Sequence, residues 1–118
     1  MIALRSEIAR ARQGERAALA GPFLAVPSPM VVEIACAARP DFVCIDMEHG
    51  PISPTMAEDM LRAAALWHVP ALVRVPGPDA VAIGQALDSG AAGVLVPRVS
   101  SAEEARAAVM AARFPPEG

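Results

Sequence analysis

Polar side chains that could do chemistry gather in one segment of the sequence, Asp46 to His49, directly after an apolar run. His49 can act as a general base, because imidazole titrates near neutral pH and a nearby carboxylate fixes its tautomer. The alternative is a histidine in a surface loop. Asp46 and Glu48 would face the same side of an extended chain and could hold a divalent cation through oxygen. Such a cation takes about six oxygen ligands, so the sequence contains no complete metal site, and solvated loop carboxylates are the alternative.

Two arginines follow later apolar runs, Arg74 in LVRVPGPD and Arg98 in VPRVSS. A guanidinium group is always charged and is costly to bury unless it meets an anion such as a carboxylate or an enolate. Arg74 is therefore a candidate for binding a substrate, and a structural ion pair with Asp46, Glu48 or Asp79 explains it equally well. The same interpretation extends to Arg98 with less support.

Three further residues lie at predicted helix ends. Asp88, in ALDSGAAG, ends a helix, where the negative end of the helix dipole disfavours a carboxylate. This position indicates either a function or an aspartate that bonds to the backbone of the Ser-Gly turn. His68, in LWHVP, is interpreted as complementing a helix dipole, with no catalytic role. Its neighbour Trp67 is predicted to lie in the core.

The elements that must position these residues follow from the apolar periodicity. A leading helix is predicted over residues 1–20, with Leu4, Ile8 and Ala11 on its apolar face. Short apolar runs predict strands buried on both faces, at Pro22–Val26, Asp41–Asp46, Pro70–Val75 and Gly93–Pro97. Helices separate them, and each has a capping start signal, at Ser28-Pro29, at Ser53-Pro54, at Asp79 and at Ser101 with Glu104.

This alternation predicts an α/β fold with parallel strands and helical crossovers. Four units could form a small open sheet or half of a (β/α)8 barrel, which usually needs about 250 residues. Length favours the open sheet, but RFPPEG follows the last helix with no fifth strand to complete one. We therefore expect residues 1–118 to be a single partial domain. Because functional loops follow the strands in such folds, we expect His49 and Arg74 at the same end of the sheet, with Asp46 and Glu48 close by.

The composition excludes several classes of function. The 118 residues are 54% hydrophobic and 19% charged, which is typical of a soluble globular domain. A net charge of −3 with scattered signs argues against a nucleic-acid groove or a basic membrane-binding face, and no apolar run is long enough to span a membrane. Cys36 and Cys44 lie in apolar stretches and no signal segment precedes them, so we expect buried thiols in a cytoplasmic protein. All ten basic residues are arginine, which excludes a lysine Schiff base.

Several segments together resemble one enzyme family: GPFLAVPSPMVVEIACAARPDFVCIDMEHGP, LVRVPG, IGQALDSGAAGVLVPRVSSAEEA and ARFPPEG. From Gly21 onward the chain resembles the 4-hydroxy-2-oxoheptanedioate and 2-keto-3-deoxy sugar acid aldolases of the citrate lyase β-subunit group. The resemblance implies the N-terminal half of a TIM (β/α)8 barrel, built as a homo-oligomer. It also implies reversible cleavage of 4-hydroxy-2-oxo acids to pyruvate and an aldehyde with Mg²⁺, Mn²⁺ or Co²⁺. A metal that polarises the 2-oxo group agrees with the absence of lysine.

The resemblance also implies a role for each candidate residue. His49 matches the base of the EH motif, acting through a water on the 4-hydroxyl, and Arg74 matches the arginine that steadies the pyruvate enolate. Asp88 matches the aspartate that makes this histidine more basic. A helix end lies away from the strand-end loops, so Asp88 requires either unusual local geometry or a neighbouring subunit. Asp46 and Glu48 are expected to hold water and His49 rather than the metal.

The chain departs from the family pattern in what it lacks. The family binds its metal through a glutamate and an aspartate on later strands, and neither has a counterpart here. We therefore expect no metal ligands within this chain and no aldolase activity from residues 1–118 alone. Two alternatives stay open: a non-catalytic half-barrel, and a coenzyme A ester lyase of the citrate lyase β type, against which the EHGP and RVP motifs argue.

Overall fold

A helix precedes alternating strands and helices in the computed structural model, which describes residues 4–118. The elements in chain order are α1 (Leu4–Arg12), β1 (Phe23–Leu24), α2 (Pro29–Ala37), β2 (Val43–Asp46), α3 (Pro54–Leu66), β3 (Ala71–Arg74), α4 (Ala80–Asp88), β4 (Gly93–Leu95) and α5 (Ala102–Ala111). The predicted alternation is confirmed, although each strand is shorter than its apolar run. The predicted leading helix also ends early, at Arg12, shortly before Gly14 adopts a left-handed conformation with φ of 74°.

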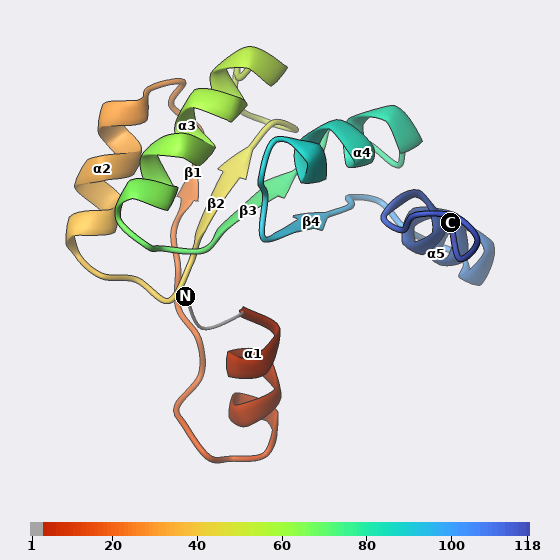
Figure 1. The fold of residues 1–118 in the computed structure, drawn as a ribbon, viewed down its shortest axis with the longest axis horizontal. Coiled ribbons are helices and arrows are strands. Elements are labelled where there is room, and N and C mark those ends of the chain that lie inside the picture. Colours follow the sequence, from red (N-terminus) through yellow and green to blue (C-terminus); the bar gives the residue numbers. More distant parts are fainter. Residues whose placement is uncertain (1–3) are drawn as a thin grey trace.

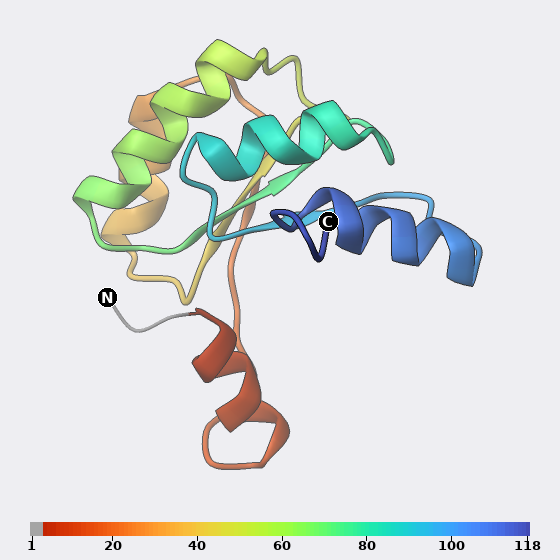
Figure 2. The same cartoon turned by 45° about the vertical axis from the view of Figure 1, so that its right-hand side comes forward.

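The strands form one parallel sheet in the order β1-β2-β3-β4. Helices α2, α3 and α4 lie along one face of this sheet (Figure 1, Figure 2). A doubly wound open sheet reverses its strand order at a switch point and carries helices on both faces, whereas a barrel adds each strand beside the previous one. The sequential order therefore fits neighbouring units of a (β/α)8 barrel.

The two faces of the sheet differ in burial. On the face that the helices cover, Val43, Ile45 and Val73 are fully buried and form the centre of the core. On the opposite face, Phe23 is 51% exposed and Leu95 is 38% exposed. The expectation of strands buried on both faces is confirmed for β2, in which all four residues are buried, and is wrong for β1 and β4.

Most helix starts are capped as predicted. The Ser53 hydroxyl accepts a hydrogen bond from the Met56 amide, and the Asp79 carboxylate accepts one from the Ala82 amide. Ser101 and Glu104 form a capping box on α5. Ser28 occupies the N-cap position of α2, but its side chain makes no capping hydrogen bond, so that part of the prediction is wrong.

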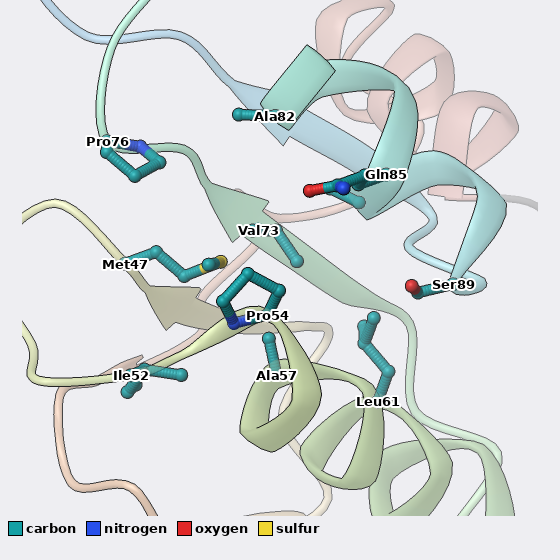
Figure 3. A pocket seen from close by; sticks show the side chains of 11 residues that line it. Met47, Ile52, Pro54, Ala57, Leu61, Val73, Pro76, Ala82, Gln85 and Ser89 are labelled. Atoms are coloured by element: carbon teal, nitrogen blue, oxygen red, sulfur yellow. The ribbon is translucent and has the colours of Figure 1, made fainter. Parts of the chain in front are cut away.

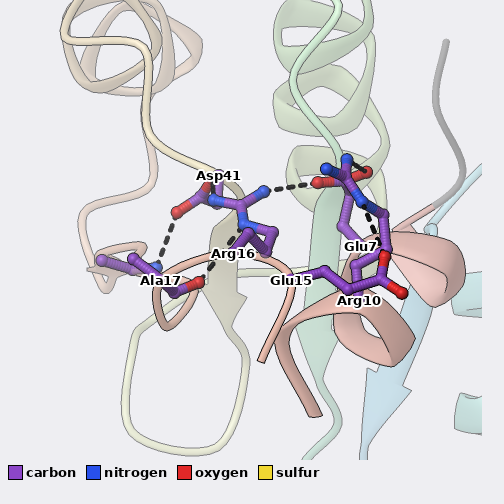
Figure 4. A network of polar contacts seen from close by, with 7 residues as sticks. Glu7, Arg10, Glu15, Arg16, Ala17 and Asp41 are labelled. Atoms are coloured by element: carbon purple, nitrogen blue, oxygen red, sulfur yellow. Dashed lines mark hydrogen bonds and ion pairs between the residues drawn. The ribbon is translucent and has the colours of Figure 1, made fainter. Parts of the chain in front are cut away.

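Helix α1 is attached at the N-terminal end of the sheet (Figure 1). Arg16, in the segment that follows α1, pairs with Glu7 of α1 and, at 2.6 Å, with Asp41, which precedes β2 (Figure 4). Ile8, predicted on the apolar face of the leading helix, is 44% exposed. Residues 1–3 of the predicted leading helix lie outside the described part of the chain. Polar contacts therefore do much to hold α1 to the sheet.

Three apolar side chains of interest have different surroundings. Cys36 and Cys44 are buried free thiols, as expected. Trp67 is 46% exposed where α3 ends, so its predicted place in the core is wrong.

No helix among residues 4–118 is long and apolar enough to span a membrane.

Candidate active site

The C-terminal ends of β2 and β3 carry a two-point ion pair. Asp46 and Arg74 are the last residues of these neighbouring strands and lie opposite each other in the register. Arg74 Nε donates to Asp46 Oδ1 at 2.9 Å, and Nη2 donates to Oδ2 at 2.6 Å. Of the partners that the sequence left open for Arg74, the structure selects Asp46.

This pair shifts the pKa of both groups. Asp46 is only 4% exposed, and the hydrogen bonds from Arg74 lower its carboxyl pKa to about 2, against the opposing effect of burial. The same contact raises the pKa of Arg74. Both groups are therefore charged at neutral pH, and the Asp46 carboxylate acts as a fixed anchor for the guanidinium.

The loop that follows Asp46 folds back onto the same carboxylate. Asp46 Oδ1 accepts hydrogen bonds from the backbone amides of Glu48 at 3.1 Å and His49 at 3.2 Å. The Gly50 amide donates to the Asp46 carbonyl at 3.1 Å. A Cβ at position 50 would lie 2.4 Å from that carbonyl oxygen and 2.9 Å from the carbonyl oxygen of Ala25. The loop is thus closed by contacts that only glycine permits.

The imidazole of His49 lies between Arg74 and Glu48. Arg74 Nη2 approaches His49 Nδ1 at 3.3 Å, and His49 Nε2 lies 3.0 Å from Glu48 Oε1. Arginine can only donate, so Nδ1 accepts and, in the neutral ring, Nε2 carries the hydrogen that is donated to Glu48. The prediction that His49 and Arg74 share one end of the sheet, with Asp46 and Glu48 close by, is confirmed.

Burial differs between the two partners in this contact. The Glu48 side chain is 14% exposed, whereas that of His49 is 69% exposed. A mostly covered carboxylate that holds an exposed imidazole leaves the ring accessible to a small molecule while restricting its orientation. This arrangement can position a general base.

The described residues do not form a complete site for the divalent metal that the resemblance implies. No three His, Cys, Asp or Glu side chains within residues 4–118 are placed so that they could hold a metal ion together. Both oxygens of Asp46 are already used by Arg74. Glu48 Oε2 is buried without a hydrogen-bond partner in this part of the chain, and a single carboxylate oxygen is far from the about six ligands that Mg²⁺ takes.

Phe23 is a neighbour of the cluster that the sequence did not single out. The guanidinium of Arg74 lies 4.9 Å from the centroid of its ring. Phe23 pairs in register with Cys44, two residues before Asp46, so both project on the same face as Asp46. The alternation of side chains along these strands was the signal that could have identified Phe23.

Burial raises the pKa of the Cys44 thiol to about 11, so Cys44 stays protonated.

Asp88 and Arg98 lie apart from the cluster. Asp88 is the last residue of α4, whose nine residues extend about 12 Å away from the strand ends. Its side chain makes no hydrogen bond or ion pair within residues 4–118, so contact with His49 would require a neighbouring subunit, and its role stays a prediction. Arg98 follows β4, and its Nη2 donates to the Pro76 carbonyl at 2.9 Å.

An apolar cavity lies on the other face of the sheet, between α3 and α4 (Figure 3). It has a volume of about 190 Å³ and is lined by side chains such as Ile52, Leu61 and Val73. Gln85 and Ser89 supply polar groups at its margin. This cavity contains no titratable side chain, so we place the chemistry at the polar cluster.

The fold agrees with comparisons to known proteins. Residues 19–118 match the family described as HpcH/HpaI aldolase/citrate lyase. A 4-hydroxy-2-oxovalerate aldolase of Novosphingobium aromaticivorans is 42% identical over 99 residues, which are 83% of this chain and 38% of the relative. A 4-hydroxy-4-methyl-2-oxoglutarate aldolase of Chaetomium globosum is 39% identical over 94 residues, which are 79% of this chain and 35% of that relative.

A solved structure gives the same result. An HpcH/HpaI aldolase/citrate lyase family protein from Burkholderia cenocepacia superimposes with a TM-score of 0.85 at 35% identity, over 96% of this chain and 46% of that one. The chain belongs to the HpcH/HpaI aldolase/citrate lyase family. The predicted resemblance and the predicted fold class, β/α units of a TIM barrel behind a leading helix, are confirmed. The chain spans less than half the length of these relatives.

Proposed function

We propose that this chain is the first half of an aldolase that cleaves 4-hydroxy-2-oxo acids reversibly into pyruvate and an aldehyde. The observation that carries the proposal is the imidazole of His49, held between Glu48 and Arg74 at the strand ends of a family named for aldolases. We also propose that the whole protein is a cytoplasmic homo-oligomer that binds a small 2-oxo acid and neither nucleic acid nor membranes.

The chemistry assigned to His49 is proton removal. His49 accepts the proton of the substrate 4-hydroxyl, directly or through a water, while the bond between C3 and C4 breaks and the aldehyde leaves. The lone pair must come from Nδ1, because Nε2 faces Glu48 at 3.0 Å. The contact of Nδ1 with Arg74 is long, at 3.3 Å, so it yields readily to a substrate hydroxyl or a water.

Arg74 is assigned to the other product. The electron pair of the broken bond passes to the enolate of pyruvate, and protonation of C3 then gives pyruvate. Asp46 occupies Nε and Nη2 of Arg74, so Nη1 is left to donate to the developing enolate oxygen. A guanidinium anchored by a buried carboxylate stabilises this charge with little reorganisation. The resemblance implies Mg²⁺, Mn²⁺ or Co²⁺ in the whole protein, with ligands on strands outside this chain.

The names of the two relatives supply the substrates that we consider for this chain. The Novosphingobium protein is named for 4-hydroxy-2-oxovalerate, which carries one carboxylate. The Chaetomium protein is named for 4-hydroxy-4-methyl-2-oxoglutarate, which carries two. The proposed cleavage of the bond between C3 and C4 is common to both types, but it releases an aldehyde from the first and a ketone from the second, because C4 of the second carries a methyl group.

The test is pyruvate release by the protein expressed from its whole reading frame. Cleavage of 4-hydroxy-2-oxovalerate is followed with lactate dehydrogenase and NADH, before and after removal of divalent metal. Pyruvate formation that metal removal abolishes supports the proposal. Cleavage only of a coenzyme A ester would favour the citrate lyase type, and no cleavage of either would favour a non-catalytic half-barrel.

A second arm uses residues 1–118 alone. We expect no pyruvate formation and only weak Mn²⁺ binding by calorimetry, because the described residues offer no complete ligand set. Metal-dependent pyruvate formation by a monodisperse sample of residues 1–118 would contradict the proposal that the chain is only half of the enzyme.

A further inference from the structure

Arg98 extends over the loop that follows β3. It lies three residues beyond Leu95, which is in register with Arg74, so it emerges at the same end of the sheet as the cluster. Its Nη2 donates to the Pro76 carbonyl at 2.9 Å and would lie 3.2 Å from a Cβ at Gly77. Gly77 is three residues after Arg74, a distance of at most about 11 Å along the backbone. The guanidinium of Arg98 is therefore within reach of a small molecule bound at Arg74.

The charge of Arg98 is not neutralised by any carboxylate of the described residues. Within residues 4–118 it forms no ion pair, and its one hydrogen-bond partner there is the Pro76 carbonyl, so most of its five N–H donors are open. The carboxylate of Asp79, two residues after Gly77, accepts from the Ala82 amide in the cap of α4. Arg74, by contrast, is paired with Asp46. Arg98 is thus the uncompensated positive charge at this end of the described sheet.

The backbone of Arg98 supports a functional interpretation. Its φ is 59°, a left-handed conformation that is uncommon for residues other than glycine and that tends to occur at functional sites. This conformation follows a strand end and directs an exposed arginine side chain back over the neighbouring loop. Gly77 has no side chain that would separate the guanidinium from the loop.

We infer that Arg98 binds a second carboxylate of the substrate and makes the site selective for 4-hydroxy-2-oxo diacids over the corresponding monoacids. The planar guanidinium matches a carboxylate with two parallel hydrogen bonds. A monoacid places a methyl group at the same position and leaves Arg98 without a partner. This inference rests on the proposed aldolase function.

The kinetic test uses two substrates that differ in this one group, 4-hydroxy-2-oxoglutarate and 4-hydroxy-2-oxovalerate. We expect the whole protein to prefer the diacid, and Arg98→Gln to lower the ratio of kcat/KM values, diacid over monoacid, by about tenfold or more. Arg98→Lys keeps the charge and should restore part of the ratio. Arg106→Gln removes an exposed arginine of α5 and should leave the ratio unchanged. An unchanged ratio in Arg98→Gln, or no diacid preference in the wild type, would overturn the inference.

A binding test separates this inference from the proposed reaction. 2-Oxoglutarate and 2-oxovalerate lack the 4-hydroxyl and cannot be cleaved, so calorimetry measures their affinities without turnover. We expect tighter binding of 2-oxoglutarate by the wild type and loss of that preference in Arg98→Gln. Binding with this preference but no cleavage of either 4-hydroxy acid would contradict the aldolase and retain the carboxylate site. Equal binding of the two acids, or binding of neither, would overturn the carboxylate site.

Discussion

Strand β2 has an aspartate–arginine pair at each end, and the two pairs are built differently. At the C-terminal end, Asp46 binds Arg74 through two hydrogen bonds, and its side chain is 5% exposed. At the N-terminal end, Asp41 binds Arg16 through one, and its side chain is 28% exposed. Each aspartate also accepts from backbone amides, those of Glu48 and His49 for Asp46 and that of Ala20 for Asp41.

The difference separates two roles. Asp41 joins the segment after α1 to the sheet, a structural contact at the end of the strands where barrel proteins are stabilised. Asp46 fixes a guanidinium and shapes a loop at the end where barrel enzymes carry their active sites. The same pair of residue types thus serves attachment at one end and preorganisation at the other.

The largest effect is expected from breaking the C-terminal pair. Asp46→Asn leaves the Arg74 charge without its partner and should destabilise the protein by about 3 kcal/mol, as for other broken buried pairs. Asp41→Asn should cost clearly less, because Asp41 and Arg16 both contact solvent. Urea unfolding of both variants measures the difference, and equal losses would contradict the distinction between the two ends.

The next effect concerns catalysis by the whole protein. His49→Asn should lower kcat for pyruvate release by about 10²-fold or more, because the proposed general base is lost. His68→Asn is the matched control at the other histidine, an exposed residue with φ of 56° in the turn after α3, and should leave kcat near the wild-type value. A near-wild-type kcat in His49→Asn would remove His49 from the mechanism.

The pH dependence of stability follows from Asp46. Its pKa in the folded protein is about 2, below the ordinary 3.8, so the ionised form stabilises the fold above pH 4. As pH falls from about 4 to 2, about 2 kcal/mol of this stability is lost. Urea unfolding between pH 6 and 2 should show this loss in the wild type and much less of it in Asp46→Asn. The pKa of Asp41 is also lowered, by the Ala20 amide and Arg16. Asp41→Asn should therefore also reduce the loss of stability between pH 6 and 2, but by less than Asp46→Asn does.

The smallest effect is expected at Glu48. Glu48→Gln keeps an oxygen that can accept from His49 Nε2 but removes the negative charge, so kcat should fall by about tenfold. Glu48→Ala removes both and should be slower still. Glu58→Gln, which changes an exposed glutamate on α3 paired with Arg62, is the control. Identical kcat values for Glu48→Gln and wild type would show that the carboxylate charge does not assist His49.

Local features of the fold were predictable from the sequence. The caps at Ser53, Asp79 and Ser101 were identified because a cap involves only residues a few positions apart. The gathering of His49 and Arg74 was predictable because parallel strands bring their C-terminal ends to one edge. Family resemblance added the expectation that Glu48 holds His49, and the structure shows that contact.

Other features depend on contacts that the sequence does not specify. The position of Trp67 in an apolar stretch predicted burial, yet this residue lies where α3 ends and nothing in the described chain covers it fully. The choice of Asp46 over Glu48 and Asp79 as the partner of Arg74 depends on strand register. Asp88 cannot be assigned from one chain, because its helix directs it away from the cluster.

Gly50 has a consequence for how this site tolerates change. A side chain at this position would meet the backbone carbonyl oxygens of Asp46 and Ala25, at 2.4 and 2.9 Å, and the Asp46 carbonyl cannot move away without losing its hydrogen bond from the Gly50 amide. A saturation library should therefore find position 50 nearly invariant, although glycine has no group that could touch a substrate. The freedom to acquire new specificity then lies in the loops that follow β3 and β4, while the close packing at Gly50 constrains the segment from Asp46 to Gly50.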